Sequence, residues 1–341
     1  MSSRSSMICA TIAALVCNAS PAQGQGMGTE HPQSVKPSSI MGLSSIAPGH
    51  FMLSYRFRYM SMGSNHMGTD HLEPREVLAT FPIAPISMQS SNHMLEAMAG
   101  LTNSLSVQVM VPLRSRSMLH EARSRDGFRT SSTGVGDLSI GLRHSATRGP
   151  DLAYDLGVVV SVPTGSINAT DVTPASDPHE VVLPYPMQNG SGTVDFSPSV
   201  AVLLKGPLYS LGTSARVKIR AGRNERSYKL GDEWVISSWI GGSLWGRHNG
   251  TLTIAFADWD DITGEDRDLA AQVSVVPTAD PMLRAGREVR VEPEFQFAPI
   301  MTSVGRHQVA IGARLPLWHS FGGPQLGLSW STHLTWTFMP G

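Results

Sequence analysis

The stretch that decides the fold is LGLSWSTHLTWTF, residues 326–338. Large apolar side chains occupy its even positions, with Thr332 the one exception, and small or polar side chains occupy its odd positions. A period of two is that of a β-strand with one apolar and one polar face. The apolar face would rest on a protein core in a soluble sandwich and on lipid in an outer-membrane barrel. The rest of the chain must decide between the two.

The same alternation recurs along the chain. Twelve segments show it: 51–60, 89–101, 105–113, 137–145, 152–162, 194–205, 211–220, 233–245, 251–258, 289–297, 308–317 and 326–338. Most are longer than the roughly five or six residues of a usual soluble strand. A tilted strand needs about 9–11 residues to cross a bilayer.

The connections between these segments are of two kinds that alternate in order. Short ones include 102–104 and Arg247-His248-Asn249-Gly250, which contains the Asn-Gly hairpin signal. The long polar ones are 61–87, 114–135, 163–193, 221–232 and 259–287. Outer-membrane barrels have long outer loops and short periplasmic turns, whereas a soluble sandwich has no reason to sort its loops. We therefore predict an all-β fold for residues 50–341: a transmembrane up-and-down antiparallel β-barrel of about twelve strands.

The apolar faces of these strands would be too extensive for a soluble monomer, and no amphipathic helices are available to cover them. No apolar stretch is long enough for a helical span beyond the N-terminal region. Aromatic side chains lie near strand ends or on the apolar face, as the girdles of a membrane barrel require: Tyr55, Tyr59, Trp234, Trp239, Trp245, Trp330, Trp336 and Phe338. We expect the partners of this surface to be outer-membrane lipids and lipopolysaccharide.

The N-terminus has the features of a secretory signal peptide. Arg4 precedes an apolar run over residues 7–16, and small residues around Ala22 predict cleavage after Gly24. Residues 1–24 are thus a predicted signal peptide and residues 25–49 a predicted flexible periplasmic segment. Cys9 and Cys17 leave with the signal, so the mature chain can form no disulfide. The formal net charge of −1 argues against nucleic acid as a partner.

Three motifs occur in succession. They are GVGD, which begins segment 134–144, PTG, which ends segment 156–166, and GTVD in segment 189–202. Together with MLSYRFRYMSM (52–62), they resemble a methionine-rich branch of the outer-membrane barrels assigned to phenol degradation by the meta pathway. The resemblance implies a channel of about twelve strands that admits hydrophobic small molecules. Taken by themselves, the glycines and Pro163 are explained by strand ends and bulges.

The polar parity of the strands predicts which side chains line the lumen. The predicted lining residues are Met52, Arg56, Arg58, Met94, Glu96, Met98, Met110, Arg216, Lys218, Arg220, Glu292 and Glu294. Basic residues of 216–220 on one wall and the two glutamates of 292–294 on another would set up a transverse field that orients dipolar solutes. The thioethers on the first three strands would form an adaptable lining for apolar or aromatic solutes.

The same methionines suggest a second interpretation, because thioether and imidazole ligands suit Cu(I). The candidate metal residues are Met60, Met62, His66, Met67 and His71, in a predicted outer loop over residues 60–71. An acidic stretch, DWDDITGEDRD (258–268), is expected to be a solvated outer loop, with Ca²⁺ as the alternative.

No nucleophile elbow, zinc-protease motif or P-loop occurs, so we predict no enzyme. The sequence favours passive, binding-guided passage of small hydrophobic or aromatic solutes, without a cofactor. Two alternatives stay open: a copper-linked protein that binds or passes the metal, and a structural barrel that acts through its outer loops. The oligomeric state, and whether residues 25–49 plug the lumen, stay open as well.

Overall fold

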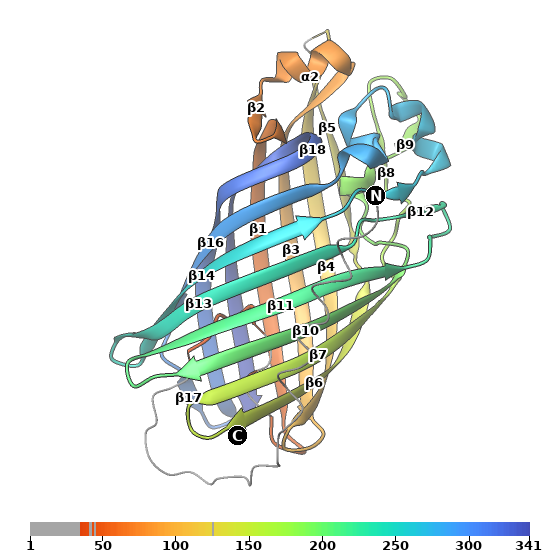
Figure 1. The fold of residues 1–341 in the computed structure, drawn as a ribbon. Helices are drawn as coiled ribbons and strands as arrows, with labels where there is room; N and C mark the ends of the chain where they lie inside the picture. The colour runs from red at the N-terminus through yellow and green to blue at the C-terminus, as the bar shows by residue number, and fades with distance from the viewer. Residues whose placement is uncertain (1–34, 41–42, 44–45, 125) are drawn as a thin grey trace, which may run out of the picture.

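The fold was obtained as a computed structural model that describes residues 35–40, 43, 46–124 and 126–341. The predicted signal peptide and residues 25–34 lie outside the described residues. Figure 1 shows one closed barrel of strongly inclined strands, with the longer connections gathered at one end and the C-terminus at the other.

Eleven labelled strands form the wall. They are β1 (Phe51–Gly68), β3 (Ile83–Gly100), β4 (Leu105–Ala122), β6 (Leu138–Arg148), β7 (Leu152–Val162), β10 (Val194–Lys205), β11 (Tyr209–Ala221), β13 (Glu233–Trp245), β14 (His248–Trp259), β16 (Gly286–Gln296) and β18 (Gly305–Pro340). Each pairs antiparallel with the next in this order, and β18 pairs with β1, which closes the sheet. Closure leaves no edge strand in the membrane, where unpaired backbone groups are costly.

The last strand, β18, spans the height of the barrel twice. It contains 36 residues, which would extend over roughly 120 Å if it were straight. Residues 310–321 pair with β16, whereas residues 321–338 pair with β1. The two ends meet, because the indole Nε1 of Trp336 donates to Nδ1 of His307 at 3.3 Å. The barrel therefore has twelve crossings, and the prediction of about twelve strands is confirmed.

Shorter elements lie mainly at the long-loop end. They are β2 (Asp70–Leu72), α2 (Pro74–Thr80), β5 (Gly127–Val135), β8 (Thr170–Val172), β9 (Glu180–Val182), η2 (Tyr185–Met187), β12 (Tyr228–Lys229), β15 (Thr263–Gly264), η3 (Arg267–Gln272), η4 (Pro277–Ala279) and η5 (Pro281–Leu283), with β17 (Ile300–Thr302) at the opposite end. No helix in the described ranges is long and apolar enough to cross a membrane.

Two predicted loops are in large part strand. The expected loops 61–87 and 114–135 contain the upper halves of β1 and β4, and β5 pairs with β4 there. The alternation of apolar and polar residues did not reveal these strand portions. Both of their faces carry small or polar residues such as Ser61, Ser117 and Ser131, because this part of the wall lies beyond the predicted membrane-crossing segments. The wall therefore extends beyond the segments predicted to cross the membrane.

The alternation settles which face meets lipid. Leu334 and Trp336 are 39% and 37% exposed on the outside of the barrel, whereas Ser331 and Thr335 are each 2% exposed on the inside. The apolar parity of the opening stretch points outward over its lower half, as predicted for contact with lipid.

The upper half of the same stretch turns inward. Trp330 pairs with Ser61, but Leu328 pairs with Met62, so Ser329 is skipped. Such a bulge moves every following side chain to the other face. Leu326 and Leu328 are consequently 7% exposed inside the outer end, which corrects their predicted contact with lipid.

One predicted girdle residue is also misplaced. Trp239 is 3% exposed and lies against the lumenal surface at Gly212, where a Cβ would come within 2.1 Å of the indole ring. Its neighbours Ile236 and Ile240 are 43% and 45% exposed. Trp239 therefore takes the inward parity of β13 and belongs to the lining of the lumen.

Candidate functional site in the barrel lumen

The inward parity contains all twelve predicted lining residues. Met52 pairs with Met98, Arg56 with Met94, and Glu96 with Met110 across the first three strands. Met98 and Glu96 are 4% and 7% exposed, while Leu95, next to Glu96 and on the outer face, is 59% exposed. The methionines of neighbouring strands thus share one patch of the inner wall.

One wall of the lumen carries a ladder of buried ion pairs across β16 and β18. Arg290 contacts Glu288 at 3.2 Å and Glu292 at 2.7 Å, and Arg314 contacts Glu292 at 3.0 Å. In the same wall His333 Nε2 lies 2.9 Å from Glu294. These carboxylates are thus already paired.

The basic wall is largely paired as well. Arg220 contacts Asp195 at 2.6 Å, and Arg216 contacts Glu233 at 3.4 Å. Of the basic side chains expected to set up the field, only Lys218 makes neither an ion pair nor a side-chain hydrogen bond within the described ranges. Partners from neighbouring strands therefore neutralise most of the charge on which the predicted transverse field depends, and the field itself stays a prediction.

A further ion pair joins β6 and β7 on the inner wall. Asp155 has no exposed surface, and its carboxylate accepts hydrogen bonds from the Arg143 guanidinium and, at 2.5 Å, from Ser145 Oγ. This pair was not predicted from the sequence, although Arg143 and Asp155 each occupy the polar parity of a predicted strand.

The N-terminal segment lies inside the barrel near the short-turn end. Ser210 Oγ, on the inner face of β11, donates to the carbonyl of Val35 at 2.6 Å. Ile40 and Leu43 pack against a lumenal apolar patch, formed by Ala153, Ala201, Leu203 and Trp239. The described part of the expected periplasmic segment 25–49 thus enters the lumen, a point that the sequence left open.

Polar contacts fasten this segment to the charged wall. The Ser38 backbone N–H donates to Glu294 Oε1 at 2.8 Å, and its hydroxyl donates to Oε2 at 2.5 Å. Arg56 Nη2 donates to the Ser38 carbonyl at 2.6 Å, and Gln296 Nε2 donates to the Lys36 carbonyl at 2.6 Å. Glu294, predicted as a lining residue, therefore holds the N-terminal segment.

A second segment, residues 183–193, folds into the lumen from the long-loop end. Met187 has no exposed surface, and Asn189 is 2% exposed. Arg114 Nη1 donates to the Asn189 carbonyl at 2.8 Å, and the Arg116 guanidinium donates to the Gln188 carbonyl. The upper lumen is therefore filled by this inward loop, which two arginines hold.

Two of the sequence motifs, GVGD and PTG, meet at the base of the loop with Gly190 and Ser191, which directly precede the third motif. Asp137 of GVGD accepts hydrogen bonds from the backbone N–H of Gly165 in PTG at 3.0 Å, and from that of Ser191 at 2.8 Å. A Cβ on Gly190 would lie 2.1 Å from the carbonyl oxygen of Gly165. The two backbones approach so closely that only glycine fits there. The motifs thus build the inward loop.

Three methionines of the barrel wall pack against a fourth, Met187, of this loop. Met88, Met118 and Met187 are 5% exposed or less, and they pack with the partly buried Met62 and with Leu183 and Leu326. Three of the four were not singled out in the sequence, because a strand alternation cannot show that a distant loop will pack on them. Flexible thioethers suit such an irregular contact.

The five candidate copper residues lie on β1 and β2. Met60 and Met62 lie on β1, with Met62 in the methionine cluster, while Met67 is 50% exposed. His66 contacts His71, with ring centroids 5.4 Å apart. Within the described residues no group of three or more histidine, cysteine, aspartate or glutamate side chains could hold a metal ion.

The acidic outer stretch is more structured than expected. Asp266 is 2% exposed and accepts a hydrogen bond from Arg226 at 3.1 Å. Its backbone N–H donates to the hydroxyl of Tyr185, which packs edge-on against Tyr228. Burial raises the pKa of both tyrosines, so they stay neutral hydrogen-bonding groups. The predicted solvated loop is thus partly a small core above the barrel.

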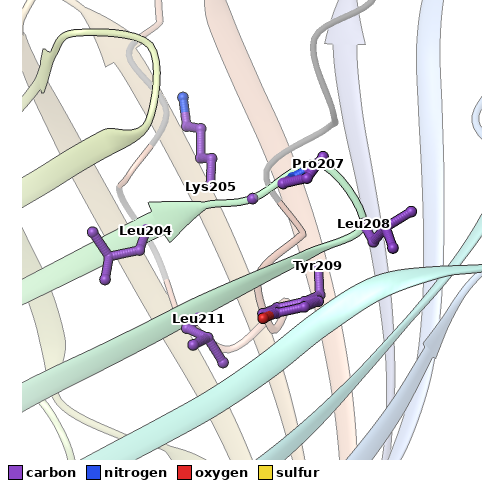
Figure 2. A pocket seen from close by; sticks show the side chains of 7 residues that line it. Leu204, Lys205, Pro207, Leu208, Tyr209 and Leu211 are labelled. Carbon is purple, nitrogen blue, oxygen red and sulfur yellow. The ribbon is translucent and has the colours of Figure 1, made fainter.

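A separate groove lies outside the lumen, at the turn between β10 and β11. It encloses about 240 Å³ and is lined by residues 204–209 and Leu211 (Figure 2). The groove lies on the outer face of the barrel wall, and neither the N-terminal segment nor the inward loop contributes to it.

Comparison with solved structures agrees with this architecture. A crystal structure of an outer membrane channel from Pseudomonas putida F1 matches over 89% of this chain and 99% of that one, at 11% identity and a TM-score of 0.61. The chain is an outer-membrane β-barrel. Weaker likenesses are to the NanC porin (9% identity, 84% of this chain and 98% of that one, TM-score 0.42) and a Pseudomonas aeruginosa FadL homologue (8%, 85% and 90%, 0.41).

No family model matches this sequence, and no curated protein is similar to it. At these identities the structural likeness concerns the fold alone, so the function must be argued from the lumen of this chain.

Proposed function

We propose that this barrel is a channel for passive passage of small hydrophobic or aromatic solutes across the outer membrane. The observation that carries the proposal is a lumen lined by paired charges and occupied by the chain's own segments. Neither segment is a strand of the barrel wall, and each is held inside the lumen by side-chain hydrogen bonds and packing. Passage would then require only local displacement of a segment, without ATP or a cofactor.

The apolar surface inside the lumen supports the solute class. The patch beneath Leu43, with Trp239 and Leu203, and the methionine pair Met52 and Met98 offer dispersion contacts without a fixed shape. Paired charges elsewhere on the wall keep the route wet and give weak hydrogen-bonding stations. A solute with an aromatic ring and one polar group would find partners for both ends.

Solute uptake by a strain that lacks the protein tests the proposal. We expect this strain to grow poorly on an aromatic compound or to accumulate less of it. The wild-type gene should restore growth and accumulation. Liposomes that contain the purified barrel should swell with the same solute. Unchanged uptake together with impermeable liposomes would refute passage and favour a structural role of the outer loops.

A further inference from the structure

The inner wall beside the N-terminal segment contains buried polar atoms that lack partners. Trp239 Nε1, Thr251 Oγ1 and Thr253 Oγ1 make no hydrogen bond with any residue in the described part of the chain. The three residues are 3%, 6% and 4% exposed. Thr253 pairs with Trp239 across β13 and β14, so all three belong to one stretch of the inner face. Buried polar groups are nearly always paired, so this stretch has hydrogen-bonding capacity left for a ligand.

The N-terminal segment covers this stretch. A Cβ on Gly241 would lie 2.7 Å from the Val35 carbonyl oxygen and 3.1 Å from the methyl group of Thr251, so Val35 lies close to Thr251. Leu43 belongs to the same buried apolar cluster as Trp239. Displacement of the segment would therefore open Thr251 and Trp239 to the lumen.

The contacts of Ser38 indicate which polar group could take its place. The Ser38 hydroxyl donates to Glu294, and Glu294 pairs directly with Thr251 across β14 and β16. Side chains paired in this way on one face have Cβ atoms about 4.5–5.5 Å apart. A ligand hydroxyl between these two residues can donate to Glu294 and accept from the Thr251 hydroxyl. A carboxylate could not, because it has no proton with which to replace the Ser38 hydrogen bond.

The apolar contacts of the segment lie close to this polar position. Ile40 packs against the cluster that contains Leu203 and Trp239. Ser38 and Ile40 are two residues apart, so at most about 7 Å separates their Cα atoms. A ligand whose hydroxyl is joined to a ring by a short linker spans this distance. Its ring would also present an electron-rich face to the indole N–H of Trp239, which an aliphatic side chain cannot do.

We propose that this stretch is the solute-binding site of the channel, and that the N-terminal segment occupies it until a neutral aryl alcohol displaces the segment. The inference rests on the proposed function, since it names the solute class and its position in the lumen. The solute hydroxyl takes the place of Ser38 between Glu294 and Thr251. The ring takes the place of Ile40 beside Trp239.

The competition between solute and segment can be measured with the full mature barrel in detergent. Residues 25–341 contain no cysteine, so the S39C variant carries a single thiol in the segment. A maleimide should label this thiol several-fold faster in the presence of 2-phenylethanol. Ethylbenzene lacks the hydroxyl and phenylacetate cannot donate a hydrogen bond, so both should have a smaller effect. An unchanged labelling rate with 2-phenylethanol, or an equal rise with either comparison compound, would overturn the proposal.

A second variant in the S39C background separates binding from folding. T251V removes a hydroxyl that has no partner among the described residues, so the urea midpoint of unfolding should not fall. The concentration of 2-phenylethanol that gives half of the maximal labelling rate should rise several-fold. T130V is the matched control, because Thr130 is a buried threonine of β5 that pairs with His120. T130V should keep the wild-type concentration, and an unchanged concentration in T251V would overturn the proposal.

Liposome swelling with 2-phenylethanol distinguishes failure of this site from failure of the channel. Swelling without faster labelling of S39C would overturn the site and support passage. Faster labelling without swelling would support the site and overturn passage.

Discussion

The hold of Glu294 on the N-terminal segment can be tested by Glu294→Ala. This substitution removes the acceptor of two Ser38 hydrogen bonds, at 2.8 and 2.5 Å. Hydrogen bonds to a charged group contribute about 1.5–3 kcal/mol each, so the two give an upper value of about 3–6 kcal/mol. Water in the lumen will replace part of the lost hydrogen bonding. We therefore expect the free energy that holds the N-terminal segment in place to fall by about 1.5–3 kcal/mol.

That weakening corresponds to a roughly 10- to 100-fold higher population of the displaced segment, at about 1.4 kcal/mol per factor of ten. Planar-bilayer recordings should show a matching rise in open probability or conductance. Ser38→Ala, which keeps the backbone hydrogen bond, should have a smaller effect. Glu233→Ala is the matched control, since Glu233 pairs with Arg216 and has no hydrogen bond to the described residues of the segment. Equal conductance of Glu294→Ala and Glu233→Ala, with both proteins folded, would refute the reasoning.

Three further perturbations follow from packing and charge. Asp155→Ala leaves the Arg143 charge buried without its partner, so the barrel should lose about 3–5 kcal/mol of unfolding free energy; a normal urea midpoint would contradict this. Met118→Ala opens a cavity beneath the inward loop, so residues 183–193 should be cleaved faster in limited proteolysis. Met118→Leu keeps the volume and costs less than about 1.5 kcal/mol of stability, so this variant should resist cleavage. Equal cleavage of the two variants would argue against the packing. Ile254→Arg places a charge on the outer face in the middle of β14, where Ile254 is 55% exposed, and should cost about 2–4 kcal/mol of stability in lipid; an unchanged midpoint would mean that this face does not meet hydrocarbon.

Alternation is a local property, and it predicted the outward face correctly over most of the wall, with Trp239 of β13 as an exception. Leu334 and Trp336 point outward as their parity requires. The pattern misled where a bulge intervenes: skipping Ser329 turned Leu326 and Leu328 inward, and nothing in the letters LGLSW marks that residue as the extra one. It also missed the strand ends above the membrane, where no apolar face is needed.

The contents of the lumen were harder to predict than its wall. Parity identified Glu294 and Arg56 as lining residues, but their common partner, Ser38, lies 256 residues from Glu294 in the chain. In the same way, Asp137 and the glycines of the three motifs were assigned to strand ends, whereas they hold one loop inside the barrel.

The sequence by itself determined the closed barrel, its twelve crossings, the sorting of its loops and the lipid-facing side, because strand periodicity and loop length depend only on neighbours in the chain. Only the tertiary structure decided which charges are neutralised and which segments occupy the lumen. Those features arise from residues that closure of the sheet brings together from distant strands, and no local pattern encodes such distances.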